Sequence, residues 1–89
     1  MPAIKLTITG HVQAVGFRAF VQKHAELLGL TGWVKNCEDG SVEVFAQGDE
    51  EKLNMLEQEC KKGPAAAEVQ QVVREELPPQ PMDHFEIRH

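Results

Sequence analysis

The residues whose types and spacing best suit chemistry lie in one segment, residues 10–18, which read GHVQAVGFR. Apolar and polar residues alternate before it, and helical spacing follows it. We therefore expect a strand-to-helix loop with Arg18 in the first turn of the helix. The first N–H groups of a helix lack partners within the helix, and its N-terminus carries about half a positive charge. An arginine beside them adds a planar set of donors for phosphate or carboxylate oxygens, and small residues at positions 10, 14 and 16 let the backbone close around an anion.

The bulk composition restricts what such an anion site can serve. The 89 residues, 42% hydrophobic and 26% charged, are typical of one soluble domain, which we expect to span residues 1–89. The net charge of −5 argues against nucleic acid and anionic membranes as partners, because both require a basic surface. An anion site must therefore be local and built from a few donors.

The N-terminal residues lack the apolar core of a signal peptide, and no apolar run is long enough to span a membrane, so we expect a cytoplasmic protein. Cys37 and Cys60 are too few for a disulfide framework or a zinc site. The four histidines show no metal-ligand spacing either. We expect free thiols, no metal ion and no cofactor.

Periodicity predicts strands and helices in the order β-α-β-β-α-β, with a short strand after them. We expect two helices to cover one face of a mostly antiparallel sheet, with Phe17 and Trp33 in the core. Asp39-Gly40 predicts a tight two-residue hairpin in which both residues have positive φ. The predicted strands cover residues 4–9, 32–37, 41–47, 69–76 and 85–87, and the predicted helices cover residues 17–28 and 49–62.

Two segments together resemble the signatures of the acylphosphatase family. The pattern GxVQxVxFR at residues 10–18 is similar to the first signature, and GWVKNxxDGxV at residues 32–42, followed by Gly48, is similar to the second. The resemblance extends over nearly the whole chain, to a last strand that ends in FEIR. It implies a ferredoxin-like α+β two-layer sandwich that hydrolyses the carboxyl–phosphate bond of acyl phosphates without a metal ion.

The resemblance also implies roles for individual residues. Arg18 and Asn36 are the expected catalytic residues: Arg18 holds the phosphoryl oxygens, and Asn36 positions the attacking water. The expected phosphate-binding loop, whose backbone N–H groups assist Arg18, consists of Gln13, Ala14, Val15, Gly16, Phe17 and Arg18. The expected ligands are a small acyl phosphate and inorganic phosphate or other anions. We expect a free-standing enzyme, because no extension follows residue 89, and a monomer, because nothing in the sequence suggests an obligate partner.

Ala14 departs from the family pattern, which has glycine at this position. If the loop requires a positive φ, alanine costs on the order of 1 kcal/mol or the loop adopts another conformation, and either can misdirect an N–H group. Alternatively, Ala14 has a negative φ and its methyl group points away from the anion.

Two other functions compete with the enzyme. A weakly active or non-catalytic module that binds phosphate or acyl phosphate is the alternative that Ala14 supports. An RNA-binding sandwich is disfavoured by the net charge and by a third strand with a single aromatic residue, Phe45, where stacking platforms have several.

Overall fold

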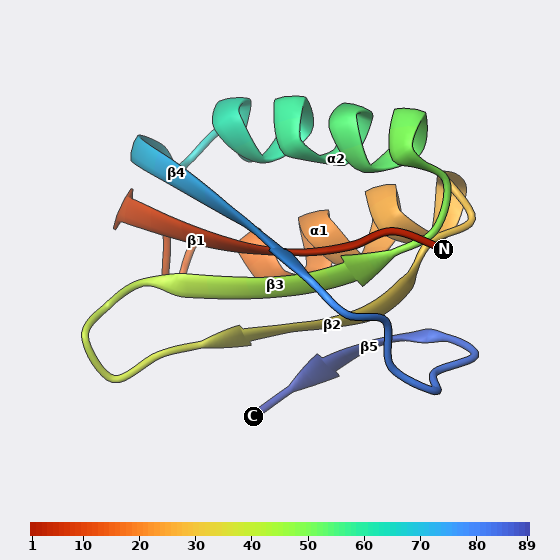
Figure 1. Cartoon of the computed structure of the whole chain (residues 1–89). Coiled ribbons are helices and arrows are strands. Elements are labelled where there is room, and N and C mark those ends of the chain that lie inside the picture. The colour runs from red at the N-terminus through yellow and green to blue at the C-terminus, as the bar shows by residue number, and fades with distance from the viewer.

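The computed structural model describes residues 1–89, in which alternating apolar residues build a mixed five-stranded sheet with both helices on one face (Figure 1). The strand order is β4-β1-β3-β2-β5; β5 runs parallel to β2, and all other neighbours are antiparallel. This confirms the predicted α+β sandwich. Its elements are β1 (Ala3–His11), α1 (Phe17–Leu27), β2 (Thr31–Asn36), β3 (Val42–Gln47), α2 (Glu50–Lys62), β4 (Glu68–Leu77) and β5 (Phe85–Arg88).

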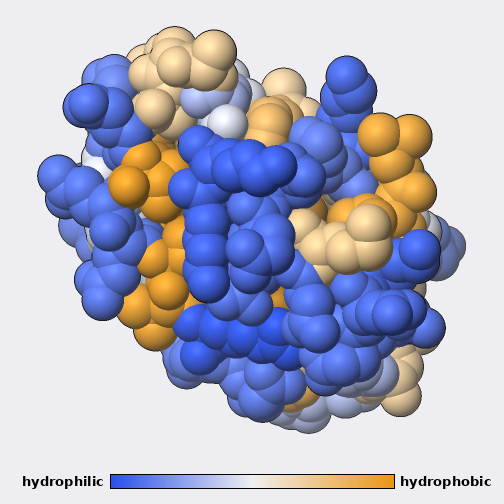
Figure 2. All heavy atoms as spheres, turned by 90° about the horizontal axis from the view of Figure 1, so that it is seen from above, coloured by the Kyte–Doolittle hydropathy of each residue, from blue (hydrophilic) through white to orange (hydrophobic).

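The main core lies between the sheet and the helices. The alternate residues Ile4, Leu6 and Ile8 of β1 are fully buried there, and Phe17 at the start of α1 is 1% exposed, as predicted. Cys60 of α2 belongs to this core, and burial raises the pKa of its thiol to about 12, so it remains neutral. The surface seen from above the helices is mainly hydrophilic, with hydrophobic side chains visible in a few strips between the polar ones (Figure 2). Neither helix is long and apolar enough to cross a membrane.

A smaller cluster covers part of the other face of the sheet. Trp33, 9% exposed, packs there with Ala3 and Phe45. The cations of Lys35 and Arg88 lie 5.5 and 5.1 Å from the centre of the Trp33 ring. This arrangement gives the tryptophan cation–π contacts on its exposed side. Trp33 is thus a core residue, as predicted, although its core is the smaller one.

The connection between β2 and β3 is longer than the predicted two-residue hairpin. Asn36 pairs with Val42, so residues 37–41 form the loop, and only Gly40 has a positive φ, of 93°. The Asp39 carboxylate accepts hydrogen bonds from Ser41 Oγ at 2.6 Å and from Ser41 N at 3.0 Å. The predicted turn is wrong because the aspartate side chain binds the backbone two residues ahead and favours a wider loop.

Arg74 links the edge strand β4 to α2. It pairs with the buried Leu6 across the sheet, so its side chain lies under the helix. The side chain is 19% exposed, and its guanidinium donates to four surrounding residues at 2.6 to 2.9 Å: Glu50, Asn54, Glu57 and Glu76. These contacts add a polar link between β4 and α2 to the backbone pairing of β4 with β1.

We expect Arg74→Met to lower the free energy of unfolding by about 1–2 kcal/mol, because several charge-assisted hydrogen bonds are lost at a mostly buried position. The loss should shrink at high salt, and urea unfolding at low and high NaCl measures both effects. In the control Lys62→Met, the lost partner Glu59 lies on the helix surface, so the change should be a few tenths of a kcal/mol. Equal losses in the two variants would contradict a special role for Arg74.

Candidate active site

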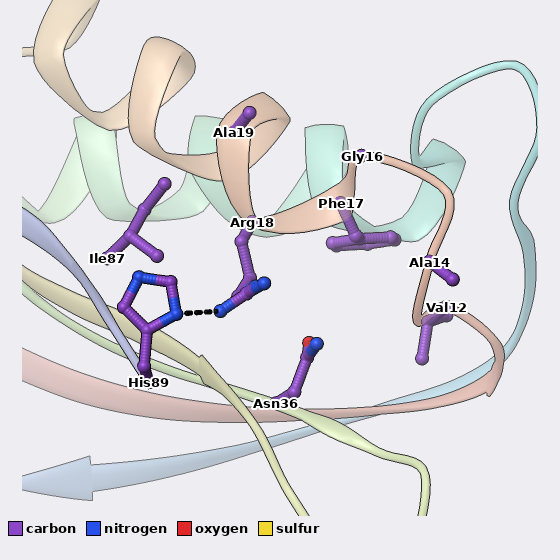
Figure 3. Close-up of a pocket in the computed structure, with 9 residues that line it drawn as sticks. All are labelled: Val12, Ala14, Gly16, Phe17, Arg18, Ala19, Asn36, Ile87 and His89. Carbon is purple, nitrogen blue, oxygen red and sulfur yellow. Dashed lines mark hydrogen bonds between the residues drawn. The ribbon is translucent and has the colours of Figure 1, made fainter.

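A pocket lies where the start of α1, the end of β2 and the segment at the end of β5 meet (Figure 3). It brings together Arg18 and Asn36, the two predicted catalytic residues, although they belong to different elements. No group of three or more histidine, cysteine, aspartate or glutamate side chains is arranged to share a metal ion. The lining residues are Val12, Ala14, Gly16, Phe17, Arg18, Ala19, Asn36, Ile87 and His89.

The N-terminus of α1 has none of the usual capping groups. Gly16 precedes the helix in the left-handed conformation, with φ 79°, and no side chain caps the helix. The first turn contains no acidic residue. By contrast, the side chain of Asp49 caps α2 by accepting a hydrogen bond from Glu51 N, and Glu50 lies in the first turn. The positive end of α1 therefore faces the pocket with N–H groups that suit an anion.

Ala14 is the only non-glycine residue with a positive φ, which is 61°. The alternative in which it has a negative φ is therefore wrong. Its methyl group points away from Arg18 and Asn36 (Figure 3). The alanine thus adopts the backbone conformation that glycine favours, at a cost on the order of 1 kcal/mol.

Arg18 reaches into the pocket from the first turn of α1 (Figure 3). Its Nη1 donates to the Arg88 carbonyl at 3.4 Å and contacts His89 Nδ1 at 3.1 Å. Because arginine only donates, His89 Nδ1 accepts in this pair. These contacts leave donors of the planar guanidinium free for two oxygens of a phosphoryl group.

Asn36 is the last residue of β2, and its side chain points toward Arg18 (Figure 3). Its Oδ1 is the only buried side-chain nitrogen or oxygen atom that has no hydrogen-bond partner within the protein. Such an atom is costly in a folded protein unless a ligand or water satisfies it. Asn36 is therefore placed to bind a donor inside the pocket.

Two predicted loop residues do not line the pocket. Val15 packs against the main core. The Gln13 side chain donates instead to the carbonyl oxygens of Cys37 and Ser41, at 2.7 and 2.9 Å. Ala14, Gly16, Phe17 and Arg18 do line the pocket, and binding of phosphate by the loop stays a prediction.

Sequence reasoning missed the C-terminal part of the lining. Ile87 and His89 are far from the loop in sequence and reach it only because β5 pairs with β2. Phe85 and Ile87 indicated only a short last strand. No spacing in the sequence pointed to contact between residues 18 and 89.

The fold and the pocket define the class, a small ferredoxin-like α+β sandwich whose site joins a strand-to-helix loop to an arginine and an asparagine. The family model described as acylphosphatase matches residues 4–87. An acylphosphatase of Synechococcus sp. (strain RCC307) is 48% identical over 94% of this chain and 72% of its own length. One from Thermotoga petrophila is 44% identical over 100% of this chain and 99% of its own length.

A solved structure agrees with these relatives. The crystal structure of acylphosphatase from Bacillus subtilis has a TM-score of 0.97 and 36% sequence identity, and the match covers 100% of both chains. The chain therefore belongs to the acylphosphatase family and is a hydrolase. An acyl phosphate is the substrate that membership in this family implies.

We expect Ala14→Gly to raise the free energy of unfolding by about 0.5–1 kcal/mol, because glycine removes the strain at a positive φ. The specificity constant for benzoyl phosphate should stay unchanged, since the loop backbone already has the left-handed conformation. Ala19→Gly, inside α1, is the control and should lower stability. Chemical denaturation and steady-state kinetics measure both properties; a higher specificity constant in Ala14→Gly would show that alanine misaligns the loop.

The loop next to Asn36 should show a pH-dependent contribution to stability. Hydrogen bonds from Ser41, first from its side chain and then from its backbone, lower the pKa of Asp39 below the ordinary value of 3.8. Such a carboxyl stabilises the fold above its unfolded pKa, and the contribution is lost as the pH falls through its folded pKa. Thermal unfolding should therefore show an advantage of the native chain over Asp39→Asn at neutral pH that disappears in acid. An advantage that persists in strong acid would contradict this assignment.

Proposed function

We propose that this pocket hydrolyses the carboxyl–phosphate bond of small acyl phosphates, with Arg18 and the loop of residues 13–18 holding the phosphoryl group. The observation that carries the proposal is the unpaired, buried Oδ1 of Asn36, which shares the pocket with Arg18 and the uncapped start of α1. A water that donates one O–H to Oδ1 keeps an oxygen lone pair for attack on phosphorus. The asparagine thus acts by positioning the nucleophile.

The chemistry needs few groups. The water oxygen forms a bond to phosphorus while the bond from phosphorus to the carboxyl oxygen breaks, and the leaving group departs as a carboxylate. Because a carboxylate is a weak base, no general acid is required. Phosphoryl transfer passes through a loose transition state that mainly requires positioning and stabilisation of charge on the equatorial oxygens. Arg18 and the N–H groups at the start of α1 supply that stabilisation.

The proton of the attacking water needs an acceptor. No aspartate or glutamate side chain lines the pocket, and its one imidazole, that of His89, accepts a hydrogen bond from Arg18. We therefore assign the proton to a phosphoryl oxygen of the substrate. In this scheme the reaction proceeds without a metal ion or a cofactor.

We also propose that the protein is a single-domain monomer of the cytoplasm. One continuous cluster of 16 buried residues supports a single domain over residues 1–89. The exposed large hydrophobic residues, Met1, Leu27, Met55 and Val73, come from different segments and support a monomer. The unpaired Cys37 and Cys60 are consistent with a reducing cytoplasm.

The test is hydrolysis of benzoyl phosphate in the presence of a chelator. We expect turnover to continue with the chelator and to collapse in Arg18→Ala, because the phosphoryl charge loses its main partner. Asn36→Ala should raise the barrier by roughly 3 kcal/mol, the scale of losing one preorganised group. Lys23→Ala, an exposed change on the same helix, is the control and should retain full activity.

Two results would overturn the assignment. Near-normal turnover in folded Asn36→Ala would exclude its positioning of the water. If the native chain and both variants are folded but inactive, the protein is an anion-binding module instead. Ala14, the residue that raised this alternative, adopts the left-handed backbone conformation that glycine would favour at this position, which supports catalysis over the binding module.

A further inference from the structure

The side chain of Gln13 connects the two segments that carry Arg18 and Asn36. Its half-buried amide donates from Nε2 to the Cys37 carbonyl at 2.7 Å and to the Ser41 carbonyl at 2.9 Å. Both acceptors belong to the loop that follows β2. One amide group of the phosphate-binding loop therefore holds both ends of the neighbouring loop.

The loop of residues 37–41, which accepts these hydrogen bonds, is itself held by hydrogen bonds. Cys37 follows Asn36 directly, and Cys37 N donates to the Ser41 carbonyl at 2.9 Å. The Asp39 carboxylate holds both the hydroxyl and the backbone N–H of Ser41. A displacement of this loop would therefore move the end of β2, where the Asn36 side chain begins.

The segment that carries Gln13 has few other hydrogen bonds to hold it in place. No backbone–backbone hydrogen bond involves residues 12–15, which lie between the end of β1 and the start of α1. Val12 and Val15 pack against the core and so hold the loop at a fixed distance from the sheet. Apolar contacts are not directional, whereas hydrogen bonds are. Gln13 is thus the residue that sets the direction of the loop relative to β2.

We propose that Gln13 is a positioning residue that fixes the phosphate-binding loop relative to Asn36 and so sets the line of attack of the water on phosphorus. This inference rests on the proposed function, because it concerns the distance between the two groups assigned there. In the proposed function the loop and Arg18 hold the phosphoryl group, whereas turnover also depends on their position relative to Asn36. Gln13 therefore acts on kcat.

The test uses Gln13→Met, which keeps the length of the side chain and removes its donors. We expect kcat for benzoyl phosphate to fall about tenfold or more, the scale on which small misplacements act. KM and the inhibition constant of inorganic phosphate should change little, because the variant keeps the contacts that bind substrate and transition state equally well. In Asn36→Ala, where the positioned group is already absent, Gln13→Met should cause almost no further loss.

Gln47→Met is the matched control. Gln47 also makes a buried cross-link, since its amide contacts Thr31 Oγ1 at 3.1 Å and Gln80 O and N at 2.7 and 2.8 Å. It lies at the opposite end of β3 from Val42, the partner of Asn36. This variant should lose stability and keep the kcat of the native chain.

Several outcomes would overturn the inference. One is an unchanged kcat in folded Gln13→Met. The second is a loss of kcat in the Asn36→Ala background that equals the loss in the native background. The third is a rise in the inhibition constant of phosphate as large as the fall in kcat. If Gln13→Met does not fold, Gln13→Asn, whose amide is one methylene shorter, takes its place under the same criteria. Failure of the proposed function is seen separately, as a folded but inactive native chain or as near-normal turnover in Asn36→Ala.

Discussion

The register of the three central strands is the constraint on which the site depends. Ile8 of β1 pairs with Val42 of β3, and Val42 pairs with Asn36 of β2, so these residues form one row across the sheet. The loop that follows β1 therefore starts beside the end of β2. Asn36 also shares the face of Val34, which is buried under the helices. A slip of one residue would turn Asn36 to the opposite face, away from α1.

The two helices use their N-termini differently. α2 begins with the capping residue Asp49 and with acidic residues that complement its positive end. α1 begins with Gly16 in the left-handed conformation, next to the strained Ala14, and has no cap. Local stability is lower at such an uncapped terminus, but its N–H groups stay available to a ligand. The stability of the surrounding core allows this local exception.

Much of the fold could be predicted from the hydrophobic periodicity and from the glycine and proline residues at which helices and strands end. Both helices and the element order follow from periodicity along the whole chain, and the resemblance carried by residues 10–18 and 32–42 implied that Arg18 and Asn36 share a site. The direction of the Gln13 side chain could not be predicted, because it depends on carbonyl groups contributed by a distant loop. The hairpin prediction failed for a related reason. Asp39-Gly40 is compatible with several turns, and the side-chain hydrogen bonds to Ser41 favour one of them.

The sheet order has a consequence for how the pocket is completed. The last two strands along the chain, β4 and β5, occupy opposite edges of the sheet, while β1, β3 and β2 form its centre. The centre and both helices can therefore come together before the edges are added. Ile87 and His89 reach the pocket only with β5, through pairings between distant parts of the chain, which are typically slow to form. The pocket is thus complete only when the end of the chain has paired with β2.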